Sequence, residues 1–448
     1  MIGAQFASGQ GPIGAEEDYK VYTEAPRLFL RPHRLRLLRR ERERQSIRWQ
    51  QFQLLMAGNA KMPEPAFASA LYYEITGDEA RGRQAIEWVL EHPGDLRELA
   101  IVADWCGKLL TPSQSQSLYA KLEAGLAATQ SAADIGTVRS RVLAAIVLAD
   151  KKPSLTEAVL RQTVVTWWRG RIVPEIEAGR DPIPLNRMFA LLELLHAVRD
   201  NLNIELRDNA AGYFKDLPAC MMLSHYPAPY PAPENLYRIP AYSGSAGPDL
   251  SAAALSRAAG LALVAYDTNA LGNQYLQGWL IQDQYLLRSA FGAPYEFLWA
   301  NPYQPGLSYY HVPLVFHDPR GGRLFARSSW EDDAVWFGLF DHRRQLFQNG
   351  KVHQLGSGDI VDPVRLGVAT ILPGVRAAHF TIDDKEPETV YIVGLKPQTP
   401  YEIEVDDQEM REDSTDAAGT LELLFPTPIQ AGVRVHLPSY PMAASRKN

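Results

Sequence analysis

From Pro26 to about Gly292, apolar residues recur at intervals of three and four, which is the period of an amphipathic α-helix. Gly-Asp, Pro-Gly-Asp, Thr-Pro and Lys-Lys-Pro boundaries separate the segments and are typical helix stop and start signals. The pattern predicts helices at residues 66–76, 79–91, 96–110, 112–130, 135–149, 155–178, 251–267 and 272–289. Because short polar turns join these helices in pairs, we expect helical hairpins that stack and bury their apolar faces on one another.

One long segment interrupts this helical pattern. Residues 224–250, SHYPAPYPAPENLYRIPAYSGSAGPDL, are rich in proline and tyrosine. Proline at this density forbids a helix and favours extended backbone. Since a long ordered loop inside a compact domain is usually functional, this segment is a candidate for a binding site.

After Tyr295 the period of the pattern changes to two. A linker at 296–313 precedes short segments in which apolar and polar residues alternate, which is typical of half-buried antiparallel sheet. We predict strands at residues 323–330, 334–341, 368–372, 376–382, 389–395, 401–405, 421–425 and 432–437. A β-sandwich is the natural packing for such strands.

The totals fit a globular protein with more than one domain. A chain of 448 residues suggests two or three domains, and 46% hydrophobic with 22% charged residues is ordinary for such proteins. The net charge of −7 gives no basic excess, so we expect no nucleic acid partner. The arginine-rich run from Arg34 to Arg48 is interpreted as the solvated face of the first helix, with a binding patch as the alternative.

Three further expectations concern the cysteines and the compartment. Cys106 and Cys220 are far apart in the sequence, and we expect each to be a small buried hydrophobic residue. No apolar run approaches the ~20 residues of a membrane span. The first residues lack a charged leader with an apolar segment, so we expect no signal peptide in this sequence; export would require that a leader had been removed.

Several segments carry a resemblance to a known family. These are APRLFLRPHRLRLLR, AFASALYYEITGDEARGRQA, ADWCGKLLTPSQ and GRLFARSSWEDDAVW, together with the order of helical hairpins before strands. The chain resembles the heparinase II/III-like proteins and related polysaccharide lyases from Pro26 to about Leu437. The resemblance implies an N-terminal arm at 1–25, an incomplete α/α toroid at 26–298, an antiparallel β-sandwich at 299–440 and a tail at 441–448.

The resemblance also implies a set of catalytic residues. Active members use an Asn near the start of a toroid helix, a Tyr in a downstream loop and a His from the sandwich. The matching positions are Asn186 in DPIPLNRMFALLELLHAV, Tyr242 in RIPAYSGSAG and His342 in the segment DHRR. Arg187 stands where the family commonly has histidine, and the histidine motif of the sandwich is reduced, so activity is left open.

The residue types suit β-elimination from a uronic acid sugar. The proton at C5 becomes acidic only when the neighbouring carboxylate is neutralised, and Asn186 with Arg187 can do this as an oxyanion hole does. Tyr242 would then remove the proton and protonate the leaving oxygen, with Arg238 lowering its pKa and His342 assisting. We predict that the sugar-contacting residues also include Tyr230, Tyr237 and Tyr303.

Each candidate also has a structural interpretation. Asp181-Pro182 is typical of an N-cap followed by proline at the first helical position, which would make Asn186 an ordinary first-turn residue. The tyrosines would then pack the proline-rich loop, His342 would be an exposed strand end, and His196 is interpreted as a core histidine.

The sequence therefore predicts a lyase-like protein acting on an acidic polysaccharide such as a glycosaminoglycan or alginate. The alternatives are a non-catalytic glycan-binding or structural protein and a glycoside hydrolase of α/α-barrel type, for which Asp104, Glu234 and Asp249 are candidate carboxylates. We expect no cofactor. A structural zinc near His342, His353 and Asp359 is the weaker alternative.

Overall fold

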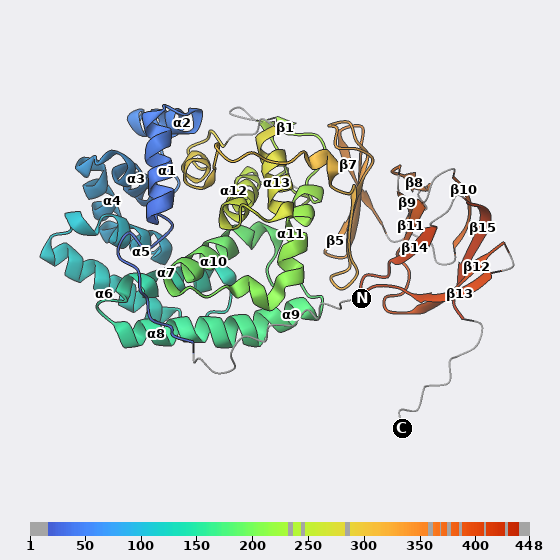
Figure 1. Cartoon of the computed structure of the whole chain (residues 1–448), viewed down its shortest axis with the longest axis horizontal. Coiled ribbons are helices and arrows are strands. Elements are labelled where there is room, and N and C mark those ends of the chain that lie inside the picture. Colours follow the sequence, from blue (N-terminus) through green and yellow to red (C-terminus); the bar gives the residue numbers. More distant parts are fainter. Residues whose placement is uncertain are drawn as a thin grey trace, which may run out of the picture.

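The computed structural model describes residues 17–231, 236–242, 247–282, 287–356, 362–367, 369–373, 378–384, 388–406, 409–425 and 429–438. It has a helical N-terminal region followed by sheets that are mostly antiparallel (Figure 1). The expected order of helices before strands is confirmed. Among the described helices, none is both long and apolar enough to cross a lipid bilayer.

Most of the described α-helices lie at predicted positions. The described α-helices are α1 (Pro32–Glu43), α2 (Ile47–Ala57), α3 (Pro65–Thr76), α4 (Glu79–Glu91), α5 (Leu96–Trp105), α6 (Pro112–Ala128), α7 (Ile135–Leu148), α8 (Pro153–Arg161), α9 (Val173–Glu177), α10 (Met188–Leu202), α11 (Ala211–Leu223), α12 (Leu250–Tyr266), α13 (Leu271–Gln282) and α14 (Ala293–Trp299). Between α8 and α9 the chain continues as a π-helix, η2 (Gln162–Ile172). The predicted range 155–178 therefore divides into α8, a π-helix and α9, and no range was predicted for α2, α11 or α14.

Short side chains fix several helix starts. Asp78, Asp95, Asp134 and Asp249 each accept hydrogen bonds from backbone N–H groups in the first turns of α4, α5, α7 and α12. These bonds satisfy donors that have no partner inside the helix. The local sequence therefore sets where these four helices begin.

Five helices of the N-terminal region pack side by side and run in the same direction: α3, α5, α7, α10 and α12. Hydrogen bonds show the direction, because Arg139 near the start of α7 reaches Glu193 in α10, and His196 further along α10 reaches Ala262 in α12. The intervening helices return the chain on the outside. We call residues 64–67, 95–98, 134–139, 185–189 and 249–252, at the starts of the five helices, the N-terminal rim.

The start of α10 differs from the predicted one. The Asp181-Pro182 pair does not begin this helix; the 3-10 turn η3 (Leu185–Arg187) comes first and α10 begins at Met188. The carboxylate of Asp181 instead accepts a hydrogen bond from Arg323 at 3.2 Å. The Asp181 side chain therefore forms an ion pair with a residue distant in sequence and, contrary to the local pattern, does not cap the helix.

The strands form three larger sheets after the helical region, besides the short pair β1 (Tyr230–Pro231) and β2 (Leu236–Tyr237). The first sheet has the order β3-β4-β5-β6-β7, the second β14-β11-β9-β8 and the third β10-β15-β12-β13. The bounds are β3 (Val315–Asp318), β4 (Arg323–Arg327), β5 (Trp336–Phe340), β6 (Arg343–Gln348), β7 (Lys351–Leu355), β8 (Val364–Arg365), β9 (Ala369–Pro373), β10 (Ala378–Asp384), β11 (Glu388–Val393), β12 (Pro400–Val405), β13 (Glu409–Ser414), β14 (Leu421–Phe425) and β15 (Ile429–His436).

In the second sheet, β11 is buried on both faces. Along β11, Val390 and Ile392 belong to a cluster shared with Ile403 and Val433 of the third sheet. Tyr391 and its neighbours pack in another cluster with residues of the first sheet. The prediction of purely antiparallel strands is wrong at one place, because β9 and β11 pair in parallel.

The first sheet packs on the end of α11 and the proline-rich loop. The indole Nε1 of Trp336 donates to the carbonyl oxygen of Leu223 at 2.7 Å, and the Tyr226 hydroxyl donates to the Gln345 side chain at 2.8 Å. Residues 300–314 lead to this sheet along the helices, with the amide of Leu307 donating to the carbonyl oxygen of Gln274. The first sheet is thereby fixed to the helical region.

Candidate functional site

A buried group of charged residues lies at the N-terminal rim. Arg97 of α5 is 2% exposed, and its guanidinium donates to both carboxylate oxygens of Glu193 in α10 at 2.7–3.2 Å. Arg139 also donates to Glu193, while Glu64 accepts from Arg97 at 3.1 Å and from the Tyr295 hydroxyl. We call these five residues the helical cluster. It ties α3, α5, α7, α10 and α14 together and makes the rim rigid.

The electrostatics of the helical cluster follow from its burial. Burial opposes ionisation of the Glu193 carboxyl, but the charges of Arg97 and Arg139 hold its pKa below the usual range. The Glu64 and Arg139 side chains keep part of their surface exposed, so the cluster reaches solvent at the rim. Five helix N-termini add partial positive charge at this end, which favours an anionic ligand.

A second carboxylate at the rim is close to being protonated at neutral pH. Glu98 follows Arg97 in the first turn of α5, and its carboxylate accepts a hydrogen bond from the amide of Phe67 at 3.0 Å. Burial raises the pKa of Glu98 to about 7, with a contribution from the nearby charge of Glu64, although the Phe67 bond acts against it. A carboxyl group with such a pKa is suited to donate or accept a proton.

Asn186 and Arg187, the predicted carboxylate-binding pair, lie at this rim. Both are exposed in η3, which contacts α12 as well as α10. Arg187 is also close enough to the N-cap of α7 to interact with the charge of Asp134. Since α7, α10 and α12 run in parallel, both predicted residues lie beside the starts of these helices.

Tyr242 is held between the proline-rich loop and the first sheet. The Gln345 side chain of β6 donates to the carbonyl oxygen of Tyr242 at 2.9 Å, and the half-buried Tyr242 ring meets the ring of Tyr226 edge-on at 6.1 Å. The chain then leads through residues 243–246, which lie outside the described part, to the start of α12 at Leu250. Tyr242 therefore lies on the segment that enters the N-terminal rim.

His342 is exposed at the tip of the hairpin formed by β5 and β6. Asp341 and His342 have φ angles of 49° and 58°, and two successive positive values define a tight type I′ turn. Asp341 is near enough to Asp181 to add to the effect of burial, which raises the pKa of the Asp181 carboxyl. His342 thus lies close to the segment that leads to Asn186, and on the same hairpin as the residue that binds Tyr242.

Arg238 lies at the other end of the first sheet. Its guanidinium donates to the carbonyl oxygen of Pro227 at 2.6 Å and to Asp332, in the turn between β4 and β5, at 3.1 Å. The five residues of β5 separate this turn from His342, and a strand of that length spans about 17 Å. Arg238 and His342 therefore cannot meet at one sugar ring.

The other predicted contact residues are more widely spread. Tyr230 is exposed and pairs with Tyr237 across β1 and β2, which contact α12 through β2. Tyr303 lies beside Arg40 of α1 and beside Arg44, the C-cap of this helix. The next residue, Gln304, bonds to the carbonyl oxygen of Thr268, just past the end of α12. Tyr303 is therefore at the opposite end of α12 from Asn186.

The residues considered for a zinc site do not lie together in the part of the chain that the structure describes. His353 is exposed on β7, opposite Leu346 of β6, whereas His342 is in the turn before β6. Asp359 lies outside the described residues. Within the described part of the chain, no group of three or more His, Cys, Asp or Glu side chains is arranged to hold a metal ion.

The interpretation of His196 as a core histidine is confirmed. His196 is buried with Nε2 2.9 Å from the carbonyl oxygen of Ala262, and Trp299 packs against Phe29. Asp104 is buried and accepts the amides of Arg27 and Leu28 at 2.7 Å. Asp249 is the N-cap of α12, and Glu234 lies outside the described residues. Cys106 and Cys220 are free and buried, as expected.

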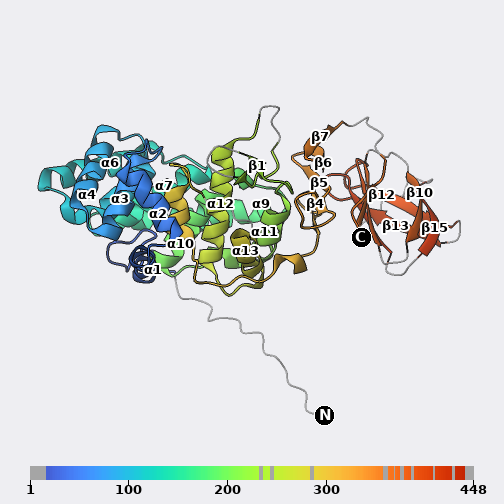
Figure 2. The same cartoon turned by 90° about the horizontal axis from the view of Figure 1, so that it is seen from above.

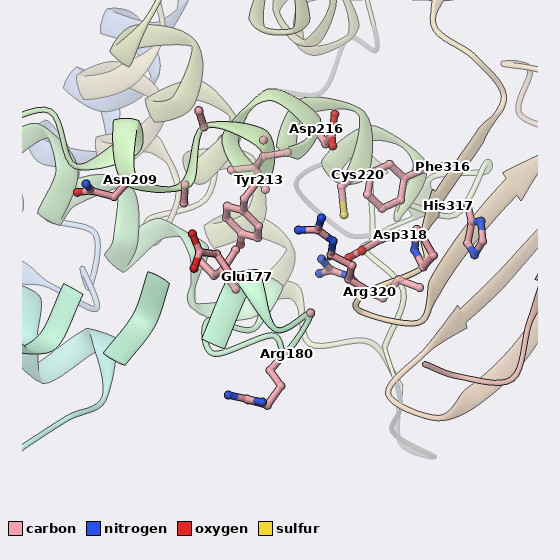
Figure 3. A pocket seen from close by; sticks show the side chains of 18 residues that line it. Glu177, Arg180, Asn209, Tyr213, Asp216, Cys220, Phe316, His317, Asp318 and Arg320 are labelled. Atoms are coloured by element: carbon pink, nitrogen blue, oxygen red, sulfur yellow. Dashed lines mark hydrogen bonds and ion pairs between the residues drawn. The ribbon is translucent and has the colours of Figure 1, made fainter. Parts of the chain in front are cut away.

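A cavity of about 500 Å³ lies elsewhere, where α9 and α11 meet the turn between β3 and β4 (Figure 3). Figure 3 shows the Tyr213 ring in the middle of its lining. Arg323 in its wall is held by Asp318 at 2.8 Å and by Asp181. The lining mixes both charges with apolar groups and includes Glu177, Arg180, Asn209, Tyr213, Asp216, Cys220, Phe316, His317, Asp318, Arg320 and Arg323. None of the residues predicted from the sequence to bind or react lines this cavity.

His317, which also lines this cavity, connects the first sheet to the second. Its ring nitrogens lie 2.7 Å from a Glu422 oxygen and 3.1 Å from an Asp416 oxygen, and the Tyr391 hydroxyl donates to Glu422. Burial would lower the pKa of His317, but its bonds to Asp416 and Glu422 outweigh this and raise the pKa to about 9. We call these four residues the sheet cluster.

The helical cluster was not predicted from the sequence. A usable signal was present, because Glu193 stands inside the apolar run LLELLHAV. A charge in the middle of a buried helix must be paired, so Glu193 implied a cationic partner. The identity of that partner depends on helix packing, which the local pattern does not contain.

The comparisons with known proteins leave the family open. No family model matches the chain, and no curated protein matches it. Among solved structures, one match is described as a glycoside hydrolase, with a TM-score of 0.31 and 9% identity over 84% of this chain and 71% of that chain. A likeness at this level indicates neither a reaction nor a substrate.

Proposed function

We propose that the protein is a carbohydrate-active enzyme that cleaves a uronic-acid-containing polysaccharide by β-elimination at the N-terminal rim. In this proposal the helical region is an incomplete α/α toroid, and the strands form β-sandwich layers. The observation that carries it is the convergence of five helix N-termini with Asn186 and Arg187 beside the rigid, partly exposed helical cluster. Such an end of a helix bundle attracts a carboxylate.

The exposed amide of Asn186 and the guanidinium of Arg187 hold the carboxylate of the uronate. Neutralising this group stabilises the negative charge that develops when the C5 proton leaves, and fixed donors cost no reorganisation during the step. The partial positive charges of the helix N-termini add to this stabilisation. The two residues therefore make the C5 proton removable.

Tyr242 acts as the base and then as the acid. Its phenolate oxygen takes the C5 proton, the C5 carbanion forms the double bond to C4, and the same proton passes to the leaving glycosidic oxygen. His342, near the segment of Asn186, assists from the hairpin tip. Arg238 is a positioning residue, because it anchors the loop to Asp332 rather than reaching the hairpin tip.

A second candidate is hydrolysis, and one observation favours it. Of the carboxylates considered from the sequence, Asp104 lies away from the rim and accepts two backbone amides, and Asp249 is the N-cap of α12. Glu98, with its pKa raised by burial to about 7, is protonated to a large extent near neutrality and is suited as a general acid. In this alternative Glu98 protonates the leaving oxygen while water attacks the sugar.

Replacing Tyr242 by Phe tests the elimination. On uronate polymers such as alginate and chondroitin, we expect the wild type to form an unsaturated product that absorbs in the ultraviolet. Tyr242→Phe should lower this rate by about 100-fold or more, since general acid–base groups contribute about that much. Thermal unfolding should change little, because the Tyr242 hydroxyl makes no hydrogen bond to the described residues.

The matched control is Tyr310→Phe, which removes the hydroxyl of an exposed tyrosine that donates to Glu331 at 3.2 Å. This variant should keep the wild-type rate. Reducing ends without ultraviolet absorbance, lost in Glu98→Gln, would instead establish hydrolysis. Binding of uronate polymers with neither product would establish a glycan-binding protein and overturn both reactions.

A further inference from the structure

The arginines of α1 divide into two groups. Arg34 is turned inward and donates to the carbonyl oxygen of Trp299 at 3.3 Å. Arg39 and Arg42 donate to the carbonyl oxygens of Glu74 and Ile75, at the end of α3. These contacts complete backbone acceptors that the helix end leaves unpaired. Three members of the run are therefore explained by packing.

The remaining arginines follow a different line on the helix. Arg36, Arg40 and Arg44 are exposed and spaced by four residues, so they lie one above another on the same side of α1. Within the described part of the chain, these three guanidiniums form no ion pair with a carboxylate. Glu43 in the same helix is also exposed, and its one negative charge leaves the stripe with an excess of positive charge.

An aromatic ring completes the stripe. The guanidinium carbons of Arg40 and Arg44 lie 6.0 Å and 5.2 Å from the centre of the Tyr303 ring. Tyr303 is 40% exposed, so the ring supports the two cations and still offers a surface to a ligand. Cation–π contacts of this kind hold long arginine side chains in place. The stripe is thus partly ordered before any ligand binds.

The stripe is a local exception in an acidic protein. The whole chain carries a net charge of −7, so the protein as a whole does not attract polyanions. A row of ordered cations beside an aromatic ring matches a chain that alternates negative groups with apolar sugar faces. The stripe fits an acidic polysaccharide better than a neutral one.

The stripe lies on the far side from the N-terminal rim. Arg42 reaches the end of α3, and Tyr303 adjoins the end of α12, whereas the rim is at the starts of these helices. Figure 2 shows α1 on the opposite side of the helical region from β1. Because α10 has fifteen residues and runs between these two ends, the stripe and the N-terminal rim lie about 22 Å apart.

We propose that Arg36, Arg40, Arg44 and Tyr303 form a docking surface for an acidic polysaccharide, separate from the rim. The substrate class rests on the proposed function, but the reaction does not enter the argument. A polymer long enough to pass round the helical region contacts both sites, and the second contact raises its effective concentration at the first. Short oligosaccharides occupy one site at a time and gain nothing.

Binding of size-fractionated alginate to immobilised protein at low salt tests the docking surface. The double variant Arg40→Gln/Arg44→Gln should bind long polyuronate about fivefold more weakly for each arginine removed, the order found for basic side chains near an anionic surface. Tyr303→Ala should cost about two- to fivefold. Turnover of a short oligouronate should be unchanged in both.

The matched control is Arg83→Gln/Arg171→Gln, which removes the same charge from exposed positions on other helices. It should bind as the wild type does. An equal loss in the control variant, or an equal dependence of polyphosphate binding on Arg40 and Arg44, would overturn the proposal in favour of general attraction between charges. If the wild type binds long polyuronate through Arg40 and Arg44 but forms no unsaturated product, the elimination is refuted and the docking surface is supported.

Discussion

Two of the buried charged groups in the described part of this protein use different cations. In the helical cluster, two arginines hold Glu193, and a guanidinium stays charged at every pH at which the protein is folded. In the sheet cluster, the cation is His317, held by Asp416 and Glu422. The ion pairs of the helical cluster therefore persist at every such pH, whereas the contact between the first and second sheets depends on protonation of His317.

The largest expected effect is in the helical cluster. Glu193→Gln removes the fully buried carboxylate that Arg97 and Arg139 share and leaves Arg97 with Glu64 as its counter-charge, and we expect a loss of about 3–5 kcal/mol in the free energy of unfolding. Chemical denaturation measures it. The control is Glu79→Gln, which breaks an exposed pair with Arg83 and should cost less than about 0.5 kcal/mol. A loss below about 1 kcal/mol at Glu193 would show that the cluster does not fasten the helices.

The sheet cluster should give the protein an alkaline limit. The pKa of His317 is raised from 6.5 to about 9, so its contribution is complete below pH 6.5 and is lost as the pH rises through about 9. Unfolding midpoints between these pH values should fall for the wild type. His317→Gln should be less stable by about 1–3 kcal/mol at neutral pH and lack this part of the slope. An identical slope in the variant would assign the alkaline loss to other groups.

The smallest effect is expected at the exposed edge of the sheet cluster. Glu422 keeps 46% of its side chain exposed, so Glu422→Gln should cost about 1 kcal/mol or less. The change should also lower the pKa of His317, observable by NMR titration of its ring, because one of its two partners is neutralised. An unchanged His317 pKa would mean that Asp416 alone holds the proton.

The sequence predicted the helices well because their signals are local. Glu79–Glu91 has the predicted bounds, since Asp78 caps its start and the apolar period continues to its end. The start of α10 was mispredicted, since Asp181 binds Arg323, a residue far away in sequence. Strands in which apolar and polar residues do not clearly alternate were not predicted either. An example is β6, which is buried because it packs on the proline-rich loop.

The candidate site was predictable only in part. Asn186 and Tyr242 follow from the resemblance, and the structure places them at the rim and on the segment that enters it. Glu98 and the helical cluster depend on which helices lie side by side. Charges at such positions are recognisable in the sequence as buried, but their partners are not.

The middle position of the second sheet has a practical consequence for producing fragments of this protein. Both faces of β11 are covered, Val390 and Ile392 by the third sheet and Tyr391 by the first. Cleavage of the chain before β12 would expose the apolar face of β11 that carries Val390 and Ile392, and it would remove no residue of the helical region. Limited proteolysis that removes the last strands should therefore yield a fragment that aggregates, while its helical region remains folded.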